Sequence, residues 1–325
     1  MTSGLLAAML IIGLVVSALA GPRVLRSAAP LLMRVPRLAA GLLAGGVAAW
    51  VLTLLAVGPV LAWVLSGPVV LPARAAQVCE QCLAAANPFG DQTFNTPFPV
   101  AILLALPAAA VLLHLTSVSI ETIRRRRSTL RTAMRYRQTA RPRRMHGYDV
   151  LLADDSHPFA LSLPRRHGGI VISTGAVQLF SVDELVAVLA HEHAHLQQRH
   201  HLITAIVSGL TTRLRWIPML AAAEDALGHY LEIAADDHAR RVSGTPALAG
   251  ALLVLGQAAR LSQQPTAEGA LYALGPNRIA NLVQPDRGTA GAVAATASTC
   301  CMAALIALAA FVHIPYMLAA LSGCI

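Results

Sequence analysis

Long apolar stretches alternate with polar ones along this 325-residue chain. Four stretches are almost wholly apolar, at about residues 5–21, 38–65, 98–118 and 290–321. A helix of about 20 apolar residues crosses the hydrocarbon core of a bilayer, and each stretch approaches or exceeds this length. The pattern predicts a mainly α membrane protein with four transmembrane helices.

The polar segments divide this membrane protein into three parts. Residues 1–120 hold three transmembrane helices and an outer loop at 66–97, and residues 290–325 hold the fourth helix and a short outer tail. Between them, residues 121–289 contain most of the charged side chains, as a folded domain outside the bilayer requires. We therefore expect a domain inserted between the third and fourth transmembrane helices.

The inserted domain has the pattern of an α+β fold. Short, mostly apolar runs at 148–153, 159–163 and 169–173 predict strands. Helical spacing of apolar residues begins at Ser181 and recurs at 246–262. The apolar run 202–210 is soon followed by two arginines, so it predicts a buried or membrane-surface helix rather than another span.

Charge orients the predicted helices across the membrane. The net charge is +9, and every positive side chain other than histidine is an arginine. Ten arginines lie in residues 124–144, directly after the third span, and juxtamembrane clusters of this kind mark the cytoplasmic side. An arm that binds nucleic acid is disfavoured, because the cluster adjoins a span and contains one aromatic residue, Tyr136.

The first apolar stretch has two interpretations. It ends in Ala18-Leu19-Ala20, a signal-peptidase type of sequence. A signal peptide carries positive charge before its apolar stretch, whereas here the arginines follow it, from Arg23 onwards. We expect a retained span with its N-terminus outside.

Three cysteines fall on the predicted outer side. Cys79 and Cys82 form a C-x-x-C, which can be half of a zinc site, a redox motif or a local disulfide. Cys324 lies in the predicted outer tail. A disulfide is compatible with an oxidising compartment, and the pattern does not determine the pairing.

The candidate chemistry is concentrated in the stretch from Ser181 to His201. Ser181 followed by Glu184 is a capping box, which predicts a helix start. The helix then carries His191-Glu192-His193-Ala194-His195, an H-E-x-x-H. Side chains four apart share a helical face, so His191 and His195 can bind one metal ion with Glu192 beside its open position.

An acidic pair further along the chain can supply the third ligand of a zinc site. Catalytic zinc is held by three protein ligands, and Glu232 can be the third. Asp236, one turn later, can accept the distal N–H of a liganding histidine. An exposed acidic helix paired with arginines is the alternative. The oxyanion donor is left open among four candidates: Tyr230, His238, Arg240 and Arg278.

These motifs resemble those of the gluzincin membrane peptidases. The resemblance rests on G-G-I-V-I-S-T-G-A-V, the H-E-x-x-H helix and E-I-A-A-D, at residues 168–177, 181–195 and 232–236. It implies Zn²⁺ held by His191, His195 and Glu232, with Glu192 as the general base. It also implies that an extended substrate is laid on an edge strand formed by Gly169, Ile170, Val171, Ile172 and Ser173.

Two related groups fit this resemblance. One is the Bla/Mec receptor-type family, and the other contains the heat-shock membrane protease and the CAAX prenyl protease. Three spans before the motif and one after it favour the first group. Those receptors carry a penicillin-binding sensor domain after the last span, which is lacking after residue 321 here, so we expect no covalent β-lactam sensor.

The expected function is an integral-membrane zinc endopeptidase that cleaves a cytoplasmic protein, for which the resemblance suggests a winged-helix repressor. The alternatives are a heat-shock-type quality-control metalloprotease and a non-catalytic signalling protein with a degenerate site. We expect a multi-pass protein of the cell membrane whose protease domain faces the cytoplasm. Its expected partners are the substrate protein and the lipid bilayer, without direct contact to nucleic acid. A homo-oligomer is left open, as are the activating signal and the cleavage site.

Overall fold

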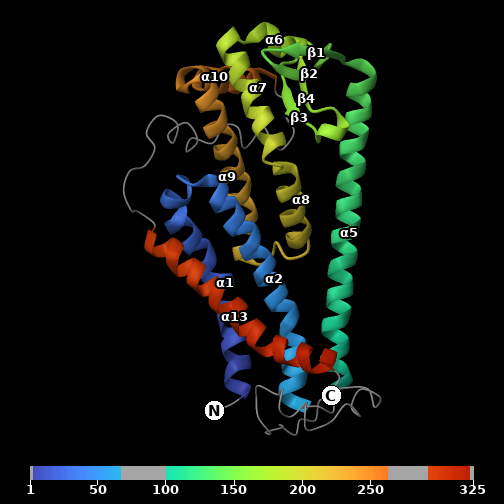
Figure 1. Ribbon diagram of the computed structural model, residues 1–325, viewed down its shortest axis with the longest axis vertical. Helices are drawn as coiled ribbons and strands as arrows, with labels where there is room; N and C mark the ends of the chain where they lie inside the picture. The colour runs from blue at the N-terminus through green and yellow to red at the C-terminus, as the bar shows by residue number, and fades with distance from the viewer. Residues whose placement is uncertain (1–2, 67–99, 263–291, 323–325) are drawn as a thin grey trace.

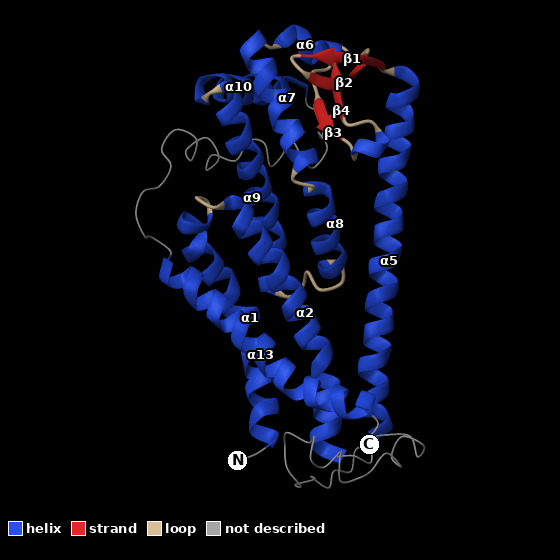
Figure 2. Ribbon diagram, in the orientation of Figure 1, coloured by secondary structure: helices blue, strands red, loops and turns tan. Residues whose placement is uncertain are grey.

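The computed structural model describes residues 3–66, 100–262 and 292–322. Within them the chain is mostly helical, with one small sheet at the end of the molecule opposite the start of α1 (Figures 1 and 2). The predicted loop cysteines Cys79 and Cys82, the candidate Arg278 and the tail residue Cys324 lie outside the described residues.

Four long helices occupy the four predicted spans. They are α1 (Ser3–Leu32), α2 (Pro36–Ser66), α5 (Val100–Thr139) and α13 (Ala292–Ser322). In the described residues, two segments are long and apolar enough to cross a membrane, namely Ala8–Leu32 and Pro36–Leu55. This criterion uses length and composition alone. Membrane crossing by α1, α2, α5 and α13 therefore stays a prediction.

Helices α1 and α5 continue well beyond the apolar stretches that predicted them. The α1 helix runs past Arg23 and Arg26 to Leu32, and α5 runs through most of the arginine cluster to Thr139. Arginine, alanine and leucine all favour helices, so a change from apolar to basic residues does not end one. The last turns of α1 instead gain packing partners, because α1 lies against α9.

The sheet contains four strands in the order β1-β2-β4-β3. They are β1 (Arg141–Met145), β2 (Tyr148–Ala153), β3 (Ala160–Ser162) and β4 (Ile170–Ser173). The three predicted strands are confirmed, whereas β1 was not predicted. It pairs with β2 through a two-residue turn at His146 and Gly147, which both have positive φ, as a type I′ hairpin requires.

The predicted edge strand is not at an edge. Strand β4 pairs in parallel with β2 on one side and antiparallel with β3 on the other. All four of its residues are buried, including Val171 and Ile172. Since both sides of β4 are already hydrogen-bonded, Gly169–Ser173 cannot receive an added strand. Within the described residues, the edges of the sheet are β1 and β3.

Five helices complete the region between α5 and α13 in the described part of the chain. They are α6 (Thr174–Leu179), α7 (Val182–Gln197), α8 (His200–Thr211), α9 (Pro218–Ser243) and α10 (Thr245–Ser262). A short 3₁₀ turn also lies at Arg165–His167. The helix predicted at residues 202–210 is confirmed as α8, which packs against α2, α5 and α9.

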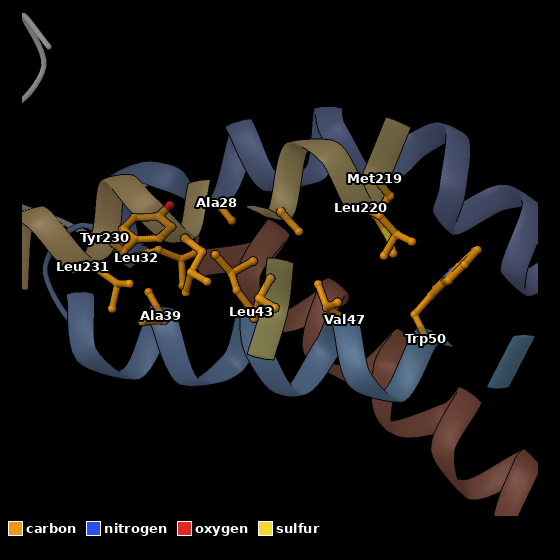
Figure 3. Close-up of a cluster of buried hydrophobic side chains, with 14 of the residues drawn as sticks. Ala28, Leu32, Ala39, Leu43, Val47, Trp50, Met219, Leu220, Tyr230 and Leu231 are labelled. Carbon is orange, nitrogen blue, oxygen red and sulfur yellow. The ribbon is translucent and has the colours of Figure 1, made fainter. Parts of the chain in front are cut away.

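The largest hydrophobic core joins α9 to the first two helices (Figure 3). Leu220 and Leu227 on α9 are nearly inaccessible, and burial of such a side chain contributes about 1.5–3 kcal/mol. Met219 lies so close to Gly21 of α1 that a Cβ there would overlap its side chain. Further along, Leu231 lies near Ala39 of α2. Helix α9 is thus firmly packed along both α1 and α2.

Candidate metalloprotease active site

The helix that carries the H-E-x-x-H begins as the sequence predicts. The Ser181 hydroxyl accepts a hydrogen bond from the Glu184 backbone N–H, and the Glu184 carboxylate accepts one from the Ser181 backbone N–H at 2.9 Å. This reciprocal capping satisfies two backbone donors that a helix start leaves unpaired. Apolar Leu185, Val188 and Leu189 then pack towards the sheet core.

Small side chains allow α7 and α9 to approach closely. Ala187 and Ala190 of α7 form a buried cluster with Ala239 of α9 and with Leu248 and Leu252 of α10. An alanine adds only a methyl group to the helix surface, so the two helix axes can come nearer than leucines would permit. This contact brings the ligands on α7 within reach of the carboxylates on α9.

The three predicted ligands converge at one point. His191 Nε2 lies 3.0 Å from His195 Nε2 and 3.5 Å from Glu232 Oε2, and His195 Nε2 lies 3.4 Å from Glu232 Oε1. Tetrahedral ligands at normal zinc bond lengths are about 3.4 Å apart. The ligand atoms of all three residues fall within 4.8 Å of one another. The donor set and its spacing therefore fit a Zn²⁺ ion.

Asp236 occupies the predicted supporting position. Its carboxylate Oδ1 lies 3.0 Å from His191 Nδ1, and the residue is 1% exposed. Burial favours the neutral form of His191, but hydrogen bonds and charge attraction from Asp236 and Glu232 outweigh it and raise the pKa of His191 to about 10. If zinc binds here, the same contact would hold His191 with its Nε2 towards the ion.

Glu192 is the candidate general base. It follows His191 directly on α7 and is half-buried, as are both histidine ligands and Glu232. Partial burial leaves a part of each of these side chains accessible. The structure thus brings together His191, His195, Glu232 and Asp236, with Glu192 adjacent to them.

The sequence analysis missed one residue of this site, His200. Its Nδ1 lies 2.8 Å from Nδ1 of His195, and it is 4% exposed. Burial and the neighbouring His195 lower the pKa of His200 to about 3, so His200 is neutral. His195 and His200 are five residues apart, a spacing that does not place two side chains on one helical face. The contact forms because the backbone of Arg199 between them is left-handed, with φ 54°.

The four proposed oxyanion donors are not among the residues that converge. Tyr230 is buried in the core against α1 and α2, which raises its pKa to about 12. Two residues along a helix are 200° apart, so Tyr230 faces away from Glu232. Arg240 forms an ion pair with Asp237 at 3.0 Å, and His238 lies beside His193. Arg278 is outside the described residues.

Comparison with known proteins points to one peptidase family. Residues 121–266 match the family model for Peptidase family M48. Protease HtpX of Legionella pneumophila (strain Corby) is 29% identical over 189 residues, which cover 45% of this chain and 68% of that protein. No solved structure was found to match the chain.

Two further relatives match over shorter segments. The Protease HtpX homolog of Thermodesulfovibrio yellowstonii is 28% identical over 81 residues, or 24% of this chain and 29% of that protein. The homolog of Thermoanaerobacter pseudethanolicus is 33% identical over 72 residues, or 21% and 24%. The chain thus spans less than a third of these two relatives. The more specific likeness to the Bla/Mec receptors stays a prediction, whereas the similarity of residues 121–266 to Peptidase family M48 and to the HtpX proteases supports a metalloprotease.

Proposed function

We propose that the chain is an integral-membrane zinc endopeptidase of the heat-shock quality-control type. The observation that carries this proposal is the convergence of two histidine Nε2 atoms and the Glu232 carboxylate beside Glu192. The relatives named above are HtpX proteases, which favours quality control over cleavage of one dedicated substrate. Two long apolar helices near the N-terminus support a membrane location.

The zinc ligands would be His191, His195 and Glu232. Zinc bound there supplies a Lewis acid that polarises the scissile carbonyl and acidifies the attacking water. Glu232 contributes one negative charge to the first coordination sphere, and the buried carboxylate of Asp236 holds His191 in orientation. The chain supplies three protein ligands, which leaves a fourth tetrahedral position for water or substrate.

Glu192 would move the protons. Its carboxylate accepts the proton of the attacking water and delivers it to the amine that leaves when the peptide bond breaks. General base catalysis of this kind typically contributes about 10²–10⁴ in rate. Glu192 is not a ligand, so its loss should separate catalysis from metal binding.

The substrate would bind along β3 rather than β4. Hydrogen bonds from Leu163 to Gly169 and from Ser173 to Phe159 place residues 159, 161 and 163 on the paired side of β3. By alternation, the backbone groups of Ala160 and Ser162 point to the free edge. Strand β3 also packs against α7, which carries the site. An extended segment could add to this edge as one more strand.

The test of the proposed function compares two variants of α7. We expect Glu192→Ala to retain zinc and to lose cleavage of unfolded membrane proteins by at least about 100-fold. The control is Gln197→Ala, an exposed position on the same helix, which should cleave normally. Unchanged proteolysis in Glu192→Ala would refute the proposal.

A receptor that cleaves a cytoplasmic repressor is the second candidate. The arrangement of three predicted spans before the motif and one after it favours it. Comparing all cytoplasmic proteins between cells with the wild type and with Glu192→Ala separates the two. A single stabilised protein supports the receptor, and accumulation of many damaged membrane proteins supports quality control.

We propose that the metal site faces the cytoplasm in either case. The arginines of α5 lie between its apolar half and the sheet, and such clusters favour the cytoplasmic side. Reporter fusion after Arg144 tests this orientation. A periplasmic signal would contradict it.

A further inference from the structure

Among the residues that the structure describes, His200 is a buried polar residue that contacts the proposed metal site and has no assigned role. It begins α8, immediately after the left-handed backbone of Arg199. This turn folds the chain back, so that the His200 ring meets the His195 ring edge to face, with centroids 4.7 Å apart. The contact joins Nδ1 of one ring to Nδ1 of the other at 2.8 Å.

The two nitrogens can form a hydrogen bond in only one direction if His195 binds metal. A neutral imidazole carries a single N–H, and Nε2 of His195 is the atom that faces His191 and Glu232. A metal at Nε2 therefore leaves the hydrogen of His195 on Nδ1. His200 must then accept it, with a bare Nδ1 and its own hydrogen on Nε2.

Gln198 supplies the partner that this arrangement demands. Its side-chain oxygen lies 3.2 Å from Nε2 of His200 and can accept that hydrogen. The result is a chain of two hydrogen bonds, from His195 to His200 and from His200 to Gln198. If His200 instead donated from Nδ1, the hydrogen of His195 would sit on Nε2 and block the metal.

We infer that His200 is a positioning residue that holds His195 in the tautomer whose Nε2 lone pair points into the metal site. This inference rests on the proposed zinc site. It gives the two histidine ligands different supports, since His191 contacts the carboxylate of Asp236 and His195 contacts a neutral ring. The neutral support has a consequence for charge. A neutral ring adds no further negative charge to a site that already holds the carboxylates of Glu192, Glu232 and Asp236.

The decisive measurement is zinc affinity, by competition with a chelator on the full-length protein. His200→Leu removes the acceptor at similar volume, and we expect about 10–100-fold weaker zinc binding. His200→Asn restores an acceptor, because the asparagine Oδ1 is as many bonds from the backbone as Nδ1 of the histidine. Most of the zinc affinity should therefore return. His201→Leu is the matched control, since His201 is exposed on the next position, and its affinity should stay within twofold.

Each outcome decides the inference. Equal zinc affinities for His200→Leu and His201→Leu would overturn it, and so would a loss in His200→Leu that His200→Asn does not restore. If His200→Leu does not fold, Gln198→Leu carries the test, with several-fold weaker binding in support and unchanged binding against. Zinc affinity is read without a substrate. A protein that shows this pattern but cleaves nothing would contradict the proposed function and leave the role of His200 intact.

Discussion

Replacing Asp236 by alanine tests the support of the other histidine ligand. Asp236 is almost inaccessible, and its carboxylate lies 3.0 Å from Nδ1 of His191. The variant removes the acceptor and leaves a buried N–H facing a small cavity. His191 can then turn, so its Nε2 is no longer held towards the metal. The neighbouring residue Asp237 offers a matched control, because it pairs with Arg240 and Arg241 at the surface.

The expected loss follows from that one contact. A hydrogen bond to a charged group contributes about 1.5–3 kcal/mol. At about 1.4 kcal/mol per factor of ten, zinc should bind roughly 10–100-fold more weakly to Asp236→Ala. Surface ion pairs such as those of Asp237 contribute about 0–1 kcal/mol to folding and do not touch the ligands. We expect Asp237→Ala to bind zinc normally.

The assay is chelator competition on both purified variants, with the melting temperature of each metal-free protein recorded as a check of folding. Asp236→Asn adds a further comparison, because its amide oxygen can still accept the His191 hydrogen and should lose less affinity. Equal zinc binding by Asp236→Ala and Asp237→Ala would refute the role assigned to Asp236.

Two further predictions concern pH and the substrate edge. Burial favours neutral His191, but the neighbouring carboxylates raise its pKa from 6.5 to about 10 in the metal-free protein. A raised pKa adds stability that is complete below pH 6.5 and is lost as pH rises towards 10. The melting temperature of chelator-treated protein should therefore fall across this pH window, whereas that of zinc-loaded protein should not. Parallel curves of melting temperature against pH would contradict this prediction. Ser162→Pro removes an N–H from the free edge of β3 and should reduce cleavage without changing the melting temperature. Leu161→Pro instead breaks the pairing with Val171 and should lower the melting temperature. Normal cleavage by Ser162→Pro would argue against binding along β3.

The proposed metal ligands could be identified from the sequence because their signals are local. Helical spacing relates His191 to His195, and the same rule relates Glu232 to Asp236. The capping box defined the start of α7 through two contacts that are only three residues apart. No local pattern in the sequence predicted that α7 packs on α9 through alanines. The approach of the histidine pair on α7 to the acidic pair on α9 therefore had to be assumed.

The errors came from long-range pairing. Strand β4 reads as a short apolar run, and its burial between β2 and β3 depends on a parallel pairing that no local pattern specifies. Strand β1 lay in the arginine cluster, where only the His146-Gly147 turn indicated a hairpin. His200 was overlooked because its contact with His195 depends on one left-handed residue. Tyr230 could have been rejected from sequence, since two residues along a helix do not share a face.

Helix α9 links the proposed metal site to α1 and α2, and this packing would set where the proposed protease cuts a substrate. Met219 packs on Gly21, which lies two residues before Arg23, the first charged residue after the apolar stretch of α1. Glu232 is 13 residues further along α9, or about 20 Å at 1.5 Å per residue. If the bilayer ends near Arg23, a substrate anchored in it would have to extend about six residues beyond its span to reach the proposed ligands, because an extended chain covers about 3.3 Å per residue. A bond inside the hydrocarbon core would then be out of reach of the site, because α9 packs on both α1 and α2 and cannot descend without breaking the hydrophobic core that joins them. The packing of α9 would therefore limit the proposed protease to segments that have left the membrane, such as loops or unfolded domains.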